Sequence, residues 1–180
     1  IDEIEDRLFR KEAWDDYVGG LYATGHPILQ ELSEVGLEIG ALYPIFQRMA
    51  DYPDVEEWPA PRIELPDLAP ARQVLLEYVE HMKNLVPTLP KDPGSDTLIP
   101  KYRQLSRILD YHDLNQPARF MEILDEFSKA KVTQKNWPGK KEQALREQER
   151  WDAFRVRFVE PLQKIWFAYR YEIGLRAILP

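Results

Sequence analysis

The sequence contains no cysteine among its 180 residues. That absence excludes disulfide bonds, thiolate metal sites and cysteine nucleophiles together. No apolar stretch approaches the roughly 20 residues that a membrane-spanning helix requires. A basic start followed by a short apolar run is missing as well, so no secretory signal is visible. These absences predict a cytoplasmic protein that makes no contact with a membrane.

The sequence also lacks the short motifs that carry nucleotide and hydrolase chemistry. It has no G-x-x-x-x-G-K-[ST] phosphate loop, no G-x-G-x-x-G and no G-x-S-x-G. The three histidines are far apart, and none has glutamate three residues before it, as di-iron bundles require. Glu77 and His81 are one helical turn apart, and we interpret them as a surface pair. We therefore predict no catalytic residue, no metal site and no cofactor site in this chain, which disfavours a small-molecule enzyme.

The composition is that of a stable globular domain. Hydrophobic residues make up 44% of the chain and charged residues 31%. A chain of this length buries roughly 70% of its unfolded surface, so a core forms without covalent staples. The net charge of −7 is unevenly distributed. Residues 1–68 carry 16 acidic and 5 basic groups, whereas residues 69–180 carry 15 acidic and 19 basic groups.

Apolar residues recur at helical spacing almost throughout the chain. Helices are predicted over 4–21, 27–35, 37–50, 67–86, 97–111, 115–127 and 141–173. Glycines 19 and 20 are expected to end the first helix, Gly36 the second, and Pro44 marks a start or a kink in the third. Residues 51–66 and 87–96 are predicted loops, the first of them pinned to the core by Trp58. The expected fold class is all-α, a bundle-like array of helices in a single domain spanning 1–180.

The last helix carries an aromatic and aliphatic stripe at steps of three and four. Its predicted core positions are Trp151, Phe154, Phe158, Leu162, Ile165, Tyr169 and Ile173. Pro161 lies within this helix and removes one backbone donor, so we expect a kink there. The stripe is more typical of a core than of a ligand site.

The segment from Ser128 to Lys141 is the most unusual in the chain, because it holds five lysines and no acidic residue. Cations interleaved with amides and an aromatic side chain suit a nucleic-acid backbone and its bases. The candidate nucleic-acid-binding residues are Lys129, Lys131, Thr133, Gln134, Lys135, Asn136, Trp137, Lys140 and Lys141. The alternative interpretation is a solvated connection between helices, with Trp137 in the core and the lysines serving solubility.

Four stretches resemble one family in this order along the chain. They are EAWDDYVGG at Glu12–Gly20, DYPDVEEWPAP at Asp51–Pro61, KVTQKNWPGK at Lys131–Lys140 and VEPLQKIW at Val159–Trp166. Together they resemble bacterial superfamily 1 DNA helicases of the UvrD/Rep and AddA type. The resemblance covers nearly the whole chain and concerns the helical subdomain, usually called 1B, that is inserted into the first motor domain.

The resemblance implies that the chain is a piece of a larger bacterial helicase or helicase-nuclease, which fits a sequence that begins at Ile1 without methionine. ATP and Mg²⁺ would bind in the parent protein and not in this segment. The implied partners are single-stranded or duplex DNA and the other domains of the same chain. The competing hypothesis is a helical protein-interaction module, in which the aromatic last helix and the acidic first half bind another protein.

Overall fold

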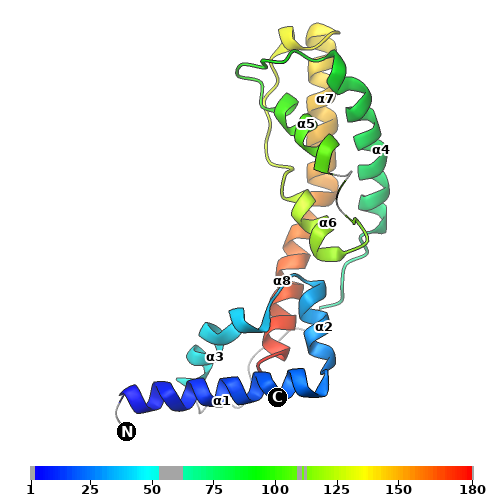
Figure 1. The fold of residues 1–180 in the computed structure, drawn as a ribbon. Coiled ribbons are helices and arrows are strands. Elements are labelled where there is room, and N and C mark those ends of the chain that lie inside the picture. The colour runs from blue at the N-terminus through cyan, green and yellow to red at the C-terminus, as the bar shows by residue number, and fades with distance from the viewer. Residues whose placement is uncertain (1–2, 53–62, 109–110, 112, 180) are drawn as a thin grey trace. The chain divides into compact units, whose positions relative to one another are not determined.

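The computed structural model describes residues 3–52, 63–108, 111 and 113–179 (Figure 1). Over these residues the chain forms helices and no strand, which confirms the all-α prediction. It divides into two compact units, Ile1–Glu64 with Phe167–Pro180, and Leu65–Trp166. The single domain over 1–180 therefore stays a prediction. Within the described ranges, every helix is too short or too polar to cross a bilayer.

The first unit is built from three α-helices, a short 3-10 helix and the end of the last helix. Its elements are α1 (Glu3–Thr24), α2 (Pro27–Glu34), η1 (Ile39–Leu42), α3 (Tyr43–Ala50) and the C-terminal part of α8 (Glu160–Arg176). Gly36 follows α2 with a φ of +66°, as predicted for a helix-ending glycine. The predicted end of α1 near Gly19 and Gly20 is wrong, because the helix continues to Thr24 and ends before Gly25, whose φ is +60°.

The core of the first unit gathers around Trp14, which is buried. Its ring lies 5.7 Å from the ring of Tyr43 and 5.1 Å from that of Phe46. Near the end of α8, the buried carboxylate of Glu172 accepts a hydrogen bond from the backbone N–H of Ile63 at 2.7 Å. The predicted anchor of the preceding loop, Trp58, lies outside the described residues.

The second unit, Leu65–Trp166, contains α7 and the helices that precede it in the chain. Its elements are α4 (Ala69–Leu85), η2 (Val86–Thr88), α5 (Leu98–Ile108), α6 (Pro117–Leu124), η3 (Gln134–Asn136), α7 (Lys140–Phe154), the π-helix η4 (Arg155–Val159) and the start of α8. The rings of Phe127 and Trp151 stack at 4.4 Å, and Tyr78 and Tyr102 meet edge to face at 5.8 Å. This aromatic cluster joins α4 and α5 to α7.

After Phe154, the core stripe of the long last helix keeps the predicted Leu162 and Ile173 but differs from the prediction at other positions. Val159 is buried in place of Phe158, which is half-buried, and Trp166 is buried in place of Ile165, which is 41% exposed. The π-helix accounts for the shift, because its wider turn adds one residue and moves the inward position from 158 to 159. Pro161 is the second residue of α8, just after the π-helix, and the kink predicted at this proline stays a prediction.

Candidate nucleic-acid interface

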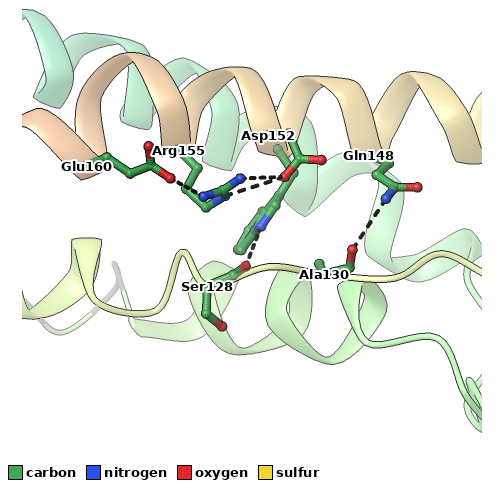
Figure 2. Close-up of polar contacts among 7 residues, drawn as sticks. Ser128, Ala130, Gln148, Asp152, Arg155 and Glu160 are labelled. Carbon is green, nitrogen blue, oxygen red and sulfur yellow. Dashed lines mark hydrogen bonds and ion pairs between the residues drawn. The ribbon is translucent and has the colours of Figure 1, made fainter.

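The basic segment, residues 128–141, leads from α6 to α7 and is fixed along α7 at its start (Figure 2). The indole Nε1 of Trp151 donates to the carbonyl oxygen of Ser128 at 2.8 Å. One turn earlier on α7, the side-chain amide of Gln148 donates to the carbonyl oxygen of Ala130 at 3.4 Å. Both donors come from a helix, so the first residues of the segment are held to a rigid element.

A single buried carboxylate, that of Asp96, organises the middle of the segment. Its Oδ1 accepts hydrogen bonds from the backbone N–H groups of Leu98 and Ile99 at 3.0 and 3.1 Å, which caps the start of α5. Its Oδ2 accepts from the backbone N–H of Thr133 at 2.7 Å and from the indole of Trp137 at 2.8 Å. The side chain is 1% exposed, so these four donors replace its hydration. Asp96 was missed from the sequence, although an aspartate two residues before Leu98 is a helix-start signal.

Further hydrogen bonds join the basic segment to the loop before α5. The backbone N–H of Thr97 donates to the carbonyl oxygen of Lys131 at 2.9 Å, and that of Lys131 donates to Thr97 Oγ1 at 2.8 Å. The side-chain amide of Asn136 donates to the carbonyl of Pro93 at 2.7 Å. The hydroxyls of Ser95 and Thr133 lie 3.3 Å apart. The polar side chains predicted at positions 133 and 136 are therefore engaged inside the protein.

Trp137 is a core residue, and its predicted role as a stacking platform for bases is wrong. It is 2% exposed, and its ring meets that of Tyr102 edge to face at 5.9 Å. The apolar ring gains more from the aromatic core than from water, and its one polar atom has Asp96 as a partner. The alternative interpretation of this side chain, as part of the core, is the one that the structure supports.

The lysines of the segment face solvent. Lys129, Lys131, Lys135, Lys140 and Lys141 are all exposed, as is Gln134. Among the described residues, none of these five ammonium groups has an ion-pair partner. Lys140 also has a φ of 49°, in the left-handed region that non-glycine residues rarely adopt. The predicted site thus separates into an outward cationic strip and an inward anchoring set of Thr133, Asn136 and Trp137.

A second buried carboxylate lies in the same unit, on α7. Glu147 is 3% exposed, and its Oε2 is 2.8 Å from Nε2 of His81 and 3.0 Å from the donating hydroxyl of Tyr102. The hydroxyl of Tyr102 also lies 2.7 Å from that of Tyr78. Burial raises the pKa of both tyrosines, and for Tyr102 the negative charge of Glu147 adds to the effect.

This network revises the interpretation of Glu77 and His81 as a pair. The partner of His81 is Glu147, which lies 66 residues further along the chain, while Glu77 accepts a hydrogen bond from Gln73 at 3.4 Å. Over the described ranges, no group of three or more histidine, aspartate or glutamate side chains is placed to hold a metal ion. His81 and Glu147 therefore belong to a hydrogen-bonded network with Tyr102.

No family model matches the chain, and no curated protein or solved structure matches it significantly. The function must therefore be argued from the chemistry of the site itself, together with the motifs noted above.

Proposed function

We propose that this chain is an accessory helical subdomain of an ATP-dependent, UvrD/Rep-like DNA helicase of the bacterial cytoplasm, and that it guides DNA beside the motor. The observation that carries the proposal is the basic segment, which presents five exposed lysines on a well-anchored backbone. The resemblance of four separate stretches to that helicase family supports the same role. In this proposal the segment binds DNA and performs no catalysis.

The chemistry of the strip favours contact with phosphates over readout of bases. Lysine is a point charge that pairs with phosphate without demanding a fixed geometry. The one aromatic ring of the segment, Trp137, is buried, so the segment offers no ring for base stacking. Binding through the strip should therefore be insensitive to base sequence and steeply dependent on salt.

A protein-interaction module remains the second candidate because of one observation on α1. Ile4, Leu8 and Phe9 lie close together on that helix and are 65, 65 and 63% exposed. Contiguous exposed apolar patches mark docking surfaces, and Ile4 and Leu8, which are four residues apart, lie on the same face of the helix. Under this alternative, substitutions in the basic segment leave DNA binding unchanged, while substitutions on α1 weaken an association between proteins.

The experiment that tests the proposal uses the intact parent protein. Replacing Lys131, Lys135 and Lys140 by Ala should lower DNA affinity and flatten the slope of log K against log salt by up to about three units. Hydrolysis of ATP without DNA should stay unchanged, because these lysines are not part of a phosphate loop.

A matched control removes three positive charges elsewhere, by changing Lys11, Arg107 and Lys164 to Ala. All three side chains are exposed and lie outside the basic segment. If both triple variants weaken DNA binding equally, net charge is responsible, and the assignment of the basic segment is wrong. The 180-residue chain alone should release no phosphate from ATP above a buffer control, because it has no phosphate loop.

A further inference from the structure

A pocket in the second unit lies between α4 and the end of α7 with its π-helix. Its volume is about 400 Å³, within the range of roughly 300–1,000 Å³ typical of small-molecule sites. The residues that give it chemical character are Glu77, Tyr78, His81, Arg150, Arg157 and Phe158. The lysines of the basic segment do not line it.

Aromatic rings and guanidinium groups alternate along the wall of this pocket. The guanidinium carbon of Arg157 lies 4.9 Å from the centre of the Phe158 ring, and that of Arg150 lies 6.0 Å from the Tyr78 ring. Phe158 is half-buried, so part of its ring is open to the pocket. A flat ligand ring can stack on such a surface while an anionic group reaches the arginines.

The Glu147 network holds one polar wall of the pocket in place. His81 and Arg150 both contact the buried Glu147 carboxylate, at 2.8 and 3.5 Å. Glu147 is in turn bonded to Tyr102, so its own position is set by α5 as well as α7. Groups held in this way lose little freedom when a ligand binds, which favours affinity.

Arg157 differs from its neighbour Arg155 on the same π-helix. Arg155 pairs with Asp152 at 3.4 Å and with Glu160, so its charge is already compensated (Figure 2). Arg157 has no carboxylate partner among the described residues, and it lines the pocket. Its planar fork of N–H donors is therefore available to a phosphate or carboxylate.

The π-helix is the reason that Phe158 and Arg157 face this pocket. The extra residue of the wide turn carries Val159 to the buried stripe and leaves Phe158 half-exposed beside it. Such bulges inside α-helices are frequent at functional sites. A regular α-helix would place Phe158 in the core, and the aromatic wall would be lost.

We propose that this pocket binds a nucleoside monophosphate group, with the phosphate on Arg157 and Arg150 and the base on the half-buried ring of Phe158. The requirement for both a flat ring and an anion distinguishes this ligand from a bare phosphate. The group can come from a free nucleotide or from one unit of a single DNA strand. This is a second site, chemically distinct from the lysine strip.

The test measures binding of deoxyadenosine monophosphate and of a short single-stranded oligonucleotide to the full 180-residue chain by calorimetry or nuclear magnetic resonance titration. Arg157→Gln should weaken nucleotide binding by about tenfold, the loss of one charge-assisted pair. Phe158→Ala should weaken it by a similar factor, through loss of stacking. Deoxyadenosine and inorganic phosphate should each bind more weakly than the nucleotide, since each lacks one half of the recognised chemistry.

Arg146→Gln is the matched control, because Arg146 is an exposed arginine of α7 that pairs with Glu142 and does not line the pocket. If Arg157→Gln weakens binding of the mononucleotide and Arg146→Gln does not, a free nucleotide is supported as the source of the bound group. If only the oligonucleotide binds and Arg157→Gln weakens it, the source is a DNA strand. Absence of saturable binding of either probe, or equal affinities for Arg157→Gln and the unmodified chain, overturns the proposal.

The lysine variants keep this outcome separate from the proposed function. Changing Lys131, Lys135 and Lys140 to Ala should leave binding of the mononucleotide unchanged, since none of the three lines the pocket. If the triple lysine variant loses the salt dependence of DNA binding, the proposal for the basic segment is supported. If Arg157→Gln has no effect on the binding of either probe in the same experiments, the proposal for the pocket is wrong.

Discussion

Two buried carboxylates of the second unit, Asp96 and Glu147, are almost equally hidden from water but have different kinds of partner. Asp96 is surrounded by backbone N–H groups and one indole. Glu147 is surrounded by side chains, namely His81, Tyr102 and Arg150. Backbone donors belong to the fold and cannot turn to another partner, whereas side chains on a pocket wall can bind a ligand. The first carboxylate builds the structure, and the second positions groups that meet solvent.

Within the second unit, Asp96 fixes the backbone of the basic segment, whereas Glu147 positions side chains of the proposed pocket. The residues around Asp96 hold the backbone of the basic segment in place, while the lysine side chains of the segment are exposed. Two of the residues around Glu147, namely His81 and Arg150, line a pocket and are partly exposed. The predictions below test whether the two carboxylates differ in this way.

The largest expected effect is that of Asp96→Ala, which should lower the free energy of unfolding by about 3–5 kcal/mol. Three backbone donors and one indole would lose their acceptor, and water has little access to the site. Glu147→Ala should lower the free energy of unfolding by about half as much, because His81 and Arg150 can reach water through the pocket. Urea denaturation of both variants measures the difference, and equal costs would contradict the distinction between the two sites.

Trp137→Phe should cost about 2 kcal/mol, because it removes one hydrogen bond to a buried charge and leaves Asp96 Oδ2 with Thr133 alone. Hydrogen exchange of the Thr133 amide should accelerate in this variant, since the middle of the basic segment loses an anchor. His81→Gln is the counterpart at Glu147 and should leave that amide unaffected. Unchanged exchange in Trp137→Phe would show that Asp96 does not organise the segment.

The network at Glu147 should make stability depend on alkaline pH. Tyr78 and Tyr102 have raised pKa values in the folded chain, so the unfolded chain releases their protons first, above about pH 10. Stability should therefore be unaffected by these groups below that pH and fall as pH rises beyond it. Tyr102→Phe should flatten this fall by up to about 1.4 kcal/mol per pH unit.

The alkaline slope is measured by denaturant unfolding at a series of pH values, with Tyr22→Phe as control. Tyr22 is 64% exposed and belongs to the first unit. A slope that Tyr102→Phe and Tyr22→Phe change equally would mean that the buried network does not govern it.

The smallest expected effect is a gain in stability from Lys140→Gly, of up to about 1 kcal/mol. Lys140 has a φ of 49°, a conformation that glycine adopts without steric cost. Lys141→Gly removes the same charge at the next position, inside α7, and should destabilise the chain instead. Thermal or urea unfolding distinguishes the two, and a loss of stability in both would show that residue 140 is unstrained.

Much of the fold could be predicted from the spacing of apolar residues. The short helix before Gly36, the helix over 69–85 and the long last helix follow from local periodicity and from proline and glycine signals. Beyond Phe154 the buried positions Leu162 and Ile173 could be predicted, whereas Val159 and Trp166 could not, because no sequence motif indicates the π-helix that changes the period. Wider turns of this kind depend on packing around the helix as much as on its own residues.

The candidate interface was only partly visible in the sequence. Exposed lysines follow directly from composition, because a run of charges without apolar neighbours has no reason to be buried. The orientation of Trp137 cannot be predicted from composition, because an indole ring can either stack on a nucleic-acid base or pack in a protein core. Asp96 decided it, from a position 41 residues away in the chain.

By itself, the sequence determined that the chain is helical, that residues 128–141 are cationic and that the usual phosphate-loop and metal motifs are absent. These properties depend on residue type and on near neighbours along the chain. Only the tertiary structure decided which carboxylates are buried, which histidine contacts Glu147 and which arginine of the π-helix has no carboxylate partner among the described residues. Such contacts join residues from different helices, and their energies depend on distance and desolvation, which arise only when the helices pack.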